Sequence, residues 1–180
     1  MEVKELDLPG VLEIIPKVFY DERGHFFESY NFESFKSQGI TTKFVQDNQS
    51  FSKAGVVRGL HFQAPPFAQI KLVRALQGKV LDIVLDCRKS SPTYGKYTSI
   101  ILDSSLNNMV YIPEGFAHGF SALEDSVFQY KCSNIYVKQA EMGVHPLDSV
   151  LSIDWNVSNP NVSQKDMELP NFHSFSSPFQ

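Results

Sequence analysis

The chain has 180 residues, of which 42% are hydrophobic and 20% charged, and its formal net charge is −4. A chain of this length predicts one globular domain with a sizeable core, and we expect a single domain over residues 1–180. The acidic balance and the lack of a long basic run argue against a nucleic-acid partner. No apolar run approaches the roughly 20 residues that cross a bilayer, so we expect no membrane association.

Aromatic residues are unusually frequent, with 15 Phe, 7 Tyr and 1 Trp. Such enrichment favours strands, and stacked rings also suit sugar or base binding. Cys87 and Cys132 are the only cysteines, which argues against a disulfide framework and predicts two small buried side chains. Met1 is followed by charged residues and no long apolar segment. We therefore expect no secretory signal and a cytoplasmic location.

Short runs of β-branched and aromatic residues, separated by turn residues, predict the strands. In chain order these strands span residues 11–20, 25–30, 42–52, 56–62, 71–76, 79–87, 97–103, 108–113, 119–123 and 126–137. One short helix is predicted over 31–39, capped by Asn31 and ended by Gly39. Many strands with almost no helix predict an all-β sandwich or barrel. The Asn-, Ser- and Pro-rich tail, about residues 171–180, is expected to wrap the surface or stay loose.

Side-chain alternation indicates which strand residues point inward. In the last predicted strand, Phe128, Tyr130 and Cys132 share one face, and a face of this composition belongs to the interior. Tyr130 is therefore predicted to be an inward-pointing phenol, as in a lined cavity. In strand 79–87, alternation places Asp82 inward as well, where it could serve as a structural hydrogen-bond acceptor.

A metal site is a weak interpretation of the histidine pattern. A metal-binding β-barrel of this kind needs two histidines one residue apart, whereas His61 is followed by Phe62 and Gln63. Only His118 could serve as the later histidine, and two isolated imidazoles rarely form a site without carboxylates to complete it. We expect no metal and no cofactor.

The remaining polar residues suit removal of a proton next to a carbonyl. The enolate oxygen must be stabilised by cations or hydrogen-bond donors, and the base must be uncharged at neutral pH, which fits a histidine. If configuration inverts, a second group must return the proton from the opposite face. The candidate donors, proton carriers and carboxylates are Arg23, Glu28, Arg58, His61, Lys71, His118, Tyr130, Glu141 and Asp166.

One geometric difficulty concerns the strand that carries Arg58 and His61. Strict alternation places residues three apart on opposite faces. Gly59 lies between them and could host a β-bulge that turns one side chain toward the site.

Six segments together resemble the dTDP-4-dehydrorhamnose 3,5-epimerase family: "DERGHFFES", "FVQDNQS", the run from Val56 to Gly95, "IPEGFAHGF", "FQYKC" and "SQKD". The likeness extends from about the first strand to Pro170, and the order and spacing of the motifs make it specific. It implies a jelly-roll (cupin-type double-stranded β-helix) sandwich that works as a homodimer with exchanged N-terminal strands. The implied ligand is a dTDP-linked 4-keto-6-deoxyhexose.

The resemblance also implies four catalytic residues. His61 of "RGLHFQ" matches the proton acceptor, and Asp166 of "SQKD" matches the carboxylate that pairs with it. Tyr130 of "FQYKC" matches the proton donor. Lys71 of "QIKLVR" matches a substrate-contacting residue suited to the enolate oxygen.

Nine further positions match substrate-binding residues of the family. Arg58 would suit the diphosphate, and His118 would contact the substrate. The full set is Arg23, Glu28, Gln46, Asp47, Asn48, Arg58, His118, Glu141 and Lys165.

Two alternatives stay open from the sequence. One is an epimerase or ketoisomerase of a related sugar nucleotide that inverts only C3 or only C5. The other is a non-catalytic sugar-nucleotide-binding or metal-binding cupin.

Overall fold

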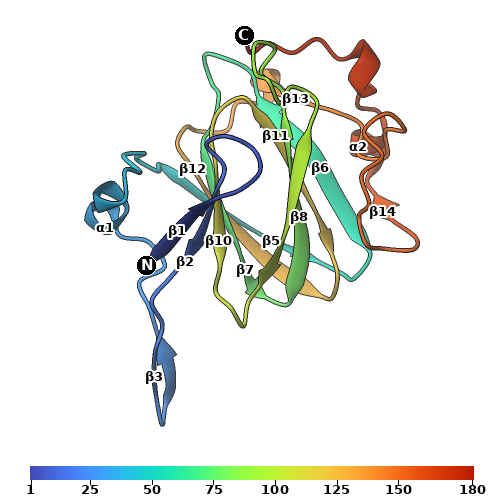
Figure 1. Cartoon of the computed structure of the whole chain (residues 1–180). Coiled ribbons are helices and arrows are strands. Elements are labelled where there is room, and N and C mark those ends of the chain that lie inside the picture. Colours follow the sequence, from blue (N-terminus) through green and yellow to red (C-terminus); the bar gives the residue numbers. More distant parts are fainter.

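The computed structural model describes all residues from 1 to 180, and it contains two packed antiparallel sheets (Figure 1). The first sheet has the strand order β1-β2-β10-β7-β12-β5. Its strands are β1 (Glu2–Glu5), β2 (Leu12–Ile15), β10 (Met109–Ile112), β7 (Lys71–Gln77), β12 (Ser126–Cys132) and β5 (Gln46–Ser52). Every pairing in this sheet is antiparallel.

The second sheet has the strand order β13-β6-β11-β8-β9, and β14 pairs with β6 in parallel. Its strands are β13 (Glu141–Gly143), β6 (Val56–Gln63), β11 (Phe116–Ala122), β8 (Lys79–Asp86), β9 (Tyr97–Asp103) and β14 (Asn161–Val162). From β5 to β13 the chain crosses between the sheets after every strand except β8, which is followed by β9 in the same sheet, so each sheet contains strands distant in sequence. This arrangement is the jelly-roll of the cupin fold and confirms the predicted fold class.

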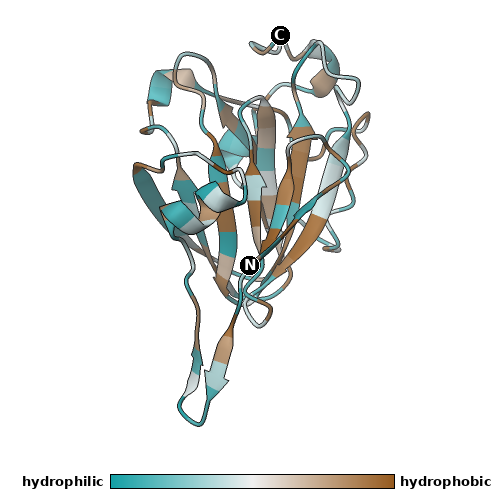
Figure 2. Ribbon diagram, turned by 60° about the vertical axis from the view of Figure 1, so that its left-hand side comes forward, coloured by the Kyte–Doolittle hydropathy of each residue, from teal (hydrophilic) through white to brown (hydrophobic).

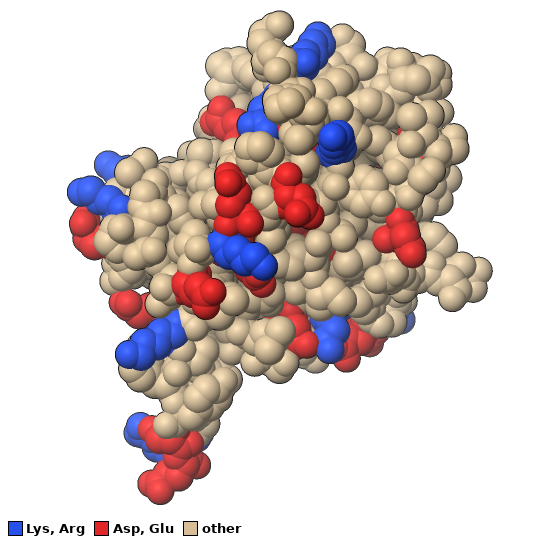
Figure 3. Space-filling model, in the orientation of Figure 1, with Lys and Arg blue, Asp and Glu red and all other residues tan.

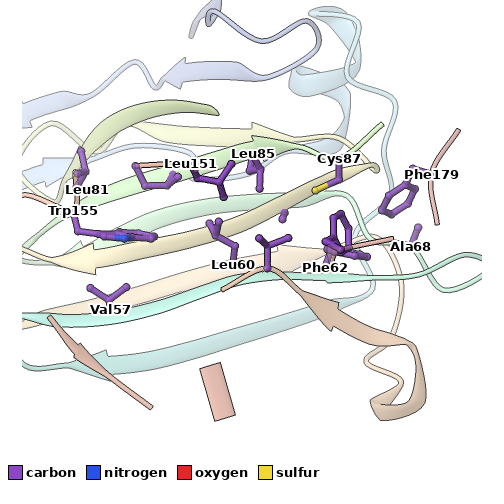
Figure 4. Close-up of a cluster of buried hydrophobic side chains, with 14 residues drawn as sticks. Val57, Leu60, Phe62, Ala68, Leu81, Leu85, Cys87, Leu151, Trp155 and Phe179 are labelled. Atoms are coloured by element: carbon purple, nitrogen blue, oxygen red, sulfur yellow. The ribbon is translucent and has the colours of Figure 1, made fainter. Parts of the chain in front are cut away.

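Three apolar layers hold the sandwich together. The interior between the sheets includes Val73, Val84 and Phe128. Outside the second sheet, Leu60 and Leu85 pack against Trp155 and other residues of the C-terminal segment (Figure 4). Because both faces of β8 are covered, every residue from Val80 to Asp86 is buried. The apolar stretches lie mainly on the strands of the sandwich (Figure 2).

The predicted helix is confirmed as α1 (Phe32–Ser37). Asn31 Oδ1 accepts hydrogen bonds from the backbone N–H groups of Glu33 and Ser34, at 3.0 and 3.3 Å. Gly39 follows the helix with a φ of 85°, a conformation that favours glycine. The buried ring of Phe35 packs α1 onto the outer face of the first sheet, in a cluster with Ile14 and Leu72.

Several predicted boundaries are wrong. Strand 11–20 ends at Ile15, next to Pro16, which has no N–H to donate to a ladder. The chain then forms a separate hairpin of β3 (Phe19–Asp21) and β4 (Gly24–Phe26). The last predicted strand ends at Cys132 instead of residue 137.

Some short elements had no sequence signal. They are β1, β13, β14, α2 (Gln164–Met167) and the 3₁₀ turns Lys138–Ala140 and Phe172–Ser174. No helix in the structure combines the length and the apolar composition that crossing a membrane would require.

The β3–β4 hairpin projects from the body of the sandwich (Figure 1). Phe19, Tyr20 and Phe26 on this hairpin are 53%, 72% and 67% exposed. The hairpin also carries charges of both signs (Figure 3). Unlike this hairpin, the C-terminal tail packs against the body of the protein. Phe175 and Phe179 are buried against Phe62, and their ring centroids lie 5.7 and 5.3 Å from that of Phe62.

Candidate active site

The site is a cavity at one end of the sandwich, lined from both sheets. A larger hollow of about 360 Å³ and a smaller one of about 120 Å³ share His61, Lys71 and Tyr130. His61 lies on β6 of the second sheet, whereas Lys71 and Tyr130 lie on β7 and β12 of the first. The imidazole and the phenol therefore reach the cavity from facing walls, and Tyr130 is the inward-pointing phenol that alternation predicted.

His61 is held by a carboxylate from the far end of the chain. Its Nε2 lies 2.7 Å from Asp166 Oδ1, and a ring N–H facing a carboxylate donates to it. This leaves Nδ1 as the free nitrogen. Ser163 caps α2 by accepting the backbone N–H of Asp166 at 3.1 Å, and the N–H of Gly59 donates to Asp166 Oδ2 at 3.3 Å. The carboxylate is thus fixed by both a helix cap and a strand.

Asp166 is suited to remain ionised. Burial raises the pKa of its carboxyl, but the hydrogen bond and charge of His61 and the Gly59 N–H outweigh burial and lower the pKa below its usual value. An ionised carboxylate fixes the tautomer of His61 and stabilises the imidazolium that forms when His61 accepts a proton.

A β-bulge resolves the alternation problem of Arg58 and His61. In the β6–β11 ladder, His61 pairs with His118 and Arg58 pairs with Phe120, so three steps along β6 match two along β11. Gly59 supplies the extra residue with a φ of 125°. Both Arg58 and His61 consequently line the smaller hollow. Arg58 Nε donates to Ser52 Oγ at 2.9 Å.

The surroundings of Lys71 and Tyr130 shift the pKa of each side chain. Burial lowers the pKa of the Lys71 ammonium, although the charges of Cys132, Asp82 and Glu141 oppose this change. Burial raises the pKa of the Tyr130 phenol, so the phenol keeps its proton at neutral pH. The Lys71 ammonium lies 6.0 Å from the centre of the Tyr130 ring.

His118 forms a second histidine–carboxylate pair on the same cavity. Its Nε2 lies 2.7 Å from Asp82 Oδ2, and both side chains are buried. Asp82 faces inward as alternation predicted. No three histidine, cysteine or carboxylate side chains come together as a metal-binding group.

Glu141 lines the larger hollow and is bonded to Lys165, which does not itself line it. Lys165 Nζ and the Tyr136 hydroxyl both donate to Glu141 Oε2 at 2.7 Å. Gln46 and Asn48 line the same hollow, and the Gln46 side-chain amide donates to Asn48 Oδ1 at 3.1 Å.

Three predicted binding residues lie away from this cavity in the single chain. Asp47 points to the outer face of the first sheet, where it pairs with Lys131 at 2.8 Å. Arg23 sits on the projecting hairpin, pairs with Asp21 at 2.6 Å, and has an 84% exposed side chain. Glu28 lies near the base of that hairpin and accepts a hydrogen bond from Asn31 at 2.7 Å.

Sequence reasoning missed three polar residues of the larger hollow: Gln63, Gln69 and Tyr136. Gln63 could have been found, because alternation from His61 places it on the same face. Its amide bonds to Phe67 O at 2.7 Å and to Ile135 O at 3.1 Å, which joins two loops of the rim. Gln69 lies in a loop, where no periodicity applies. Tyr136 also lies in a loop, although the predicted strand 126–137 included it.

A jelly-roll whose end cavity holds a carboxylate-paired histidine, a half-buried lysine and a facing tyrosine defines a class: cupin-fold enzymes that move a proton next to a carbonyl. Comparison with known proteins gives the particular family. Residues 5–174 match the family model described as dTDP-4-dehydrorhamnose 3,5-epimerase. The chain belongs to this family and is an isomerase, and its function is the epimerisation that defines the family.

Individual relatives are similar to this chain over nearly its whole length. The dTDP-4-dehydrorhamnose 3,5-epimerase of Shigella flexneri is 47% identical over 174 residues, covering 96% of each chain. A solved RmlC from Legionella pneumophila, in complex with dTDP-4-keto-L-rhamnose, superposes with a TM-score of 0.93 at 38% identity, covering 97% of this chain and 94% of that one. A dTDP-4-dehydrorhamnose 3-epimerase of Streptomyces niveus is 40% identical, covering 93% of this chain and 82% of that protein.

Proposed function

We propose that this chain inverts C3 and C5 of dTDP-4-dehydro-6-deoxyglucose to give dTDP-4-dehydrorhamnose, through an enolate. The observation that carries the proposal is that His61 and Tyr130 line one cavity from facing sheets, with Lys71 on the same walls. Inversion needs a base on one face of the carbon and an acid on the other, and these two side chains meet that requirement.

The first step is removal of a proton next to the C4 ketone. His61 Nδ1 takes the proton, the C–H electron pair forms the C=C bond of the enolate, and the negative charge develops on O4. Lys71 Nζ, with His118, stabilises that oxygen by hydrogen bonding and charge. Asp166 holds His61 and stabilises the imidazolium.

The second step returns a proton from the opposite face. The Tyr130 hydroxyl protonates the same carbon, and its high pKa keeps the proton in place until the enolate forms. The imidazolium and the tyrosinate then exchange protons with solvent. One inversion at C3 and one at C5 use the same cycle twice.

The dTDP portion fits the larger hollow. Its walls carry the amide side chains of Gln46, Asn48, Gln63 and Gln69, which suit hydrogen bonding to a base and a sugar. Lys165 and Arg58 provide positive charge for the diphosphate. The smaller hollow holds the proton carriers and suits the keto sugar.

We further propose a cytoplasmic homodimer with exchanged N-terminal strands. The β3–β4 hairpin exposes Phe19, Tyr20 and Phe26 while projecting from the chain that carries it, and such exposed apolar side chains favour burial against a second copy. Arg23 on this hairpin and Glu28 near its base would then reach the partner's cavity. The two free, buried cysteines suit the reducing cytoplasm.

The test is incubation with dTDP-4-dehydro-6-deoxyglucose in D2O, with NMR locating the label. Deuterium at both C3 and C5 is expected, whereas label at C3 alone would favour the single-carbon alternative. The His61→Asn variant should lose about 10²–10⁴-fold in exchange rate, the usual contribution of a general base. A matched control is His173→Asn, an exposed histidine of the C-terminal tail. Near-normal exchange in His61→Asn would disprove the assigned base.

A further inference from the structure

Behind His118, which lines the smaller hollow, lies a buried carboxylate that the proposed reaction cycle does not use. Asp82 lies on β8 with no exposed surface, and its Oδ2 accepts the hydrogen bond from His118 Nε2 at 2.7 Å. Its second oxygen, Oδ1, is buried without any hydrogen-bond partner. A half-satisfied buried carboxylate is costly, so its persistence calls for an explanation.

Neighbouring residues enclose the Asp82 side chain and keep it from water. In the ladders of β8 it stands opposite Phe120 of β11 and Ile100 of β9, and the interior cluster contains both neighbours on its own face, Val80 and Val84. The only partner within reach of its carboxylate is His118. Burial raises the pKa of Asp82, and the charges of His118 and Lys71, which both line the smaller hollow, oppose this change.

The two histidine–carboxylate pairs of the cavity differ in one respect. His61 and His118 are direct partners in the β6–β11 ladder. Asp166 receives a backbone N–H from Gly59 as well as the imidazole, and each added donor spreads its negative charge. Asp82 has a single partner, and its second oxygen has none.

We propose that Asp82 is a positioning residue of the active site, whose carboxylate orients His118 and whose charge keeps Lys71 protonated while the substrate enolate forms. This inference rests on the proposed function. Burial lowers the pKa of Lys71, and Asp82 is one of the charges that oppose this effect. Without Asp82, Lys71 would lose its proton at lower pH.

Other ionisable groups surround this pair from four strands. They are Arg58 and His61 on β6, His118 on β11, Tyr130 and Cys132 on β12, and Glu141 on β13. Of these, only Glu141 is an acid that is ionised at neutral pH, and Lys165 and Tyr136 already bond to it. Asp82 is therefore the carboxylate best placed to support the positive charge of Lys71.

The test is Asp82→Asn, which keeps the shape of the side chain and removes its charge. We expect kcat to fall about 10- to 100-fold, with KM changed less than about threefold, because the charge acts mainly as the enolate forms. The basic limb of the kcat–pH profile should move to lower pH. A profile that superimposes on that of the wild type would overturn the proposal.

Asp86→Asn is the matched control. Asp86 is equally buried on the same strand, but it bonds to Arg88, Ser91 and Thr93 at 2.6–2.8 Å and to no residue of the cavity. Its loss should lower the melting temperature without moving the basic limb. A shift of the same size in this control would mean that the effect of Asp82→Asn is structural.

A second measurement does not depend on turnover. The ¹³Cε NMR signal of Lys71 in the wild type, assigned by its loss in Lys71→Met, reports the charge of this amine. We expect an ammonium at neutral pH, and a neutral amine would overturn the proposal. In Asp82→Asn the same signal should change to that of a neutral amine at lower pH than in the wild type. An inactive wild type that shows this difference from Asp82→Asn would refute the proposed function and leave the electrostatic role of Asp82 supported.

Discussion

Tyr130 shows how a single side chain can be assigned from alternation. Phe128 and Cys132, two residues away on either side, are 1% exposed, so the face they share is internal. Tyr130 keeps some exposure because the cavity opens there. At this scale the sequence was a good guide, since residues two apart in a strand point the same way.

Replacing Tyr130 with phenylalanine should separate the two proton transfers. His61 would still remove the proton, so deuterium exchange would continue, but return from the opposite face would fall about 10²–10⁴-fold. NMR in D2O measures exchange and inversion in the same sample. Tyr111→Phe is the control, because that hydroxyl bonds to Thr42 at 2.8 Å on the outer face of the first sheet. Equal loss of exchange and inversion in Tyr130→Phe would contradict the proposed division of roles.

Among the elements, β6 depends most on a local irregularity. Its bulge at Gly59 brings Arg58 and His61 to one cavity. A glycine between two candidate residues indicated that a bulge could form. Only the structure shows that there is no room for a side chain at this position. A Cβ on Gly59 would lie 2.5 Å from Gly119 Cα and 2.9 Å from His118 O.

Gly59→Ala should therefore destabilise the protein by about 2–4 kcal/mol, because both the positive φ and the contact with β11 resist a side chain. Urea unfolding measures this change. Gly24→Ala is a matched control, with a φ of 130° and no atom within 4 Å of the added Cβ. Its cost should be about 1 kcal/mol. Equal costs for the two variants would show that crowding at β11 is not the cause.

The sequence did not predict helix α2, although "SQKD" was recognised as a motif. Four residues carry too little periodicity to predict a helix. The helix is defined by the Ser163 cap, and that cap places Asp166 against His61, 105 positions away in the sequence. Its role depends on the long-range contact and not on local propensity.

The whole molecule presents a feature that the single chain does not explain. Arg23 is on a hairpin that projects from the sandwich, and its side chain is 84% exposed. In the proposed dimer, this arginine serves the cavity of the other subunit.

Mixing two inactive variants tests this arrangement. Arg23→Ala lacks the arginine in every cavity, and His61→Asn lacks the base in every cavity. In a mixed dimer, the cavity with an intact His61 would receive Arg23 from the other subunit, and random pairing would restore about one quarter of wild-type activity. Activity after unfolding and refolding the mixture measures this rescue. If Arg23 acted within its own chain, no activity would return.

By itself, the sequence determined the all-β class, the inward faces of β8 and β12, and the capped helix α1, because these follow from alternation and local hydrogen bonding. The tertiary structure decided which residues meet. It covered both faces of β8 with apolar layers, paired His61 with Asp166 and His118 with Asp82, and directed the β3–β4 hairpin away from the body. The physical reason is that contacts between distant segments depend on how the sheets stack and where the chain crosses between them, and no local pattern encodes that packing.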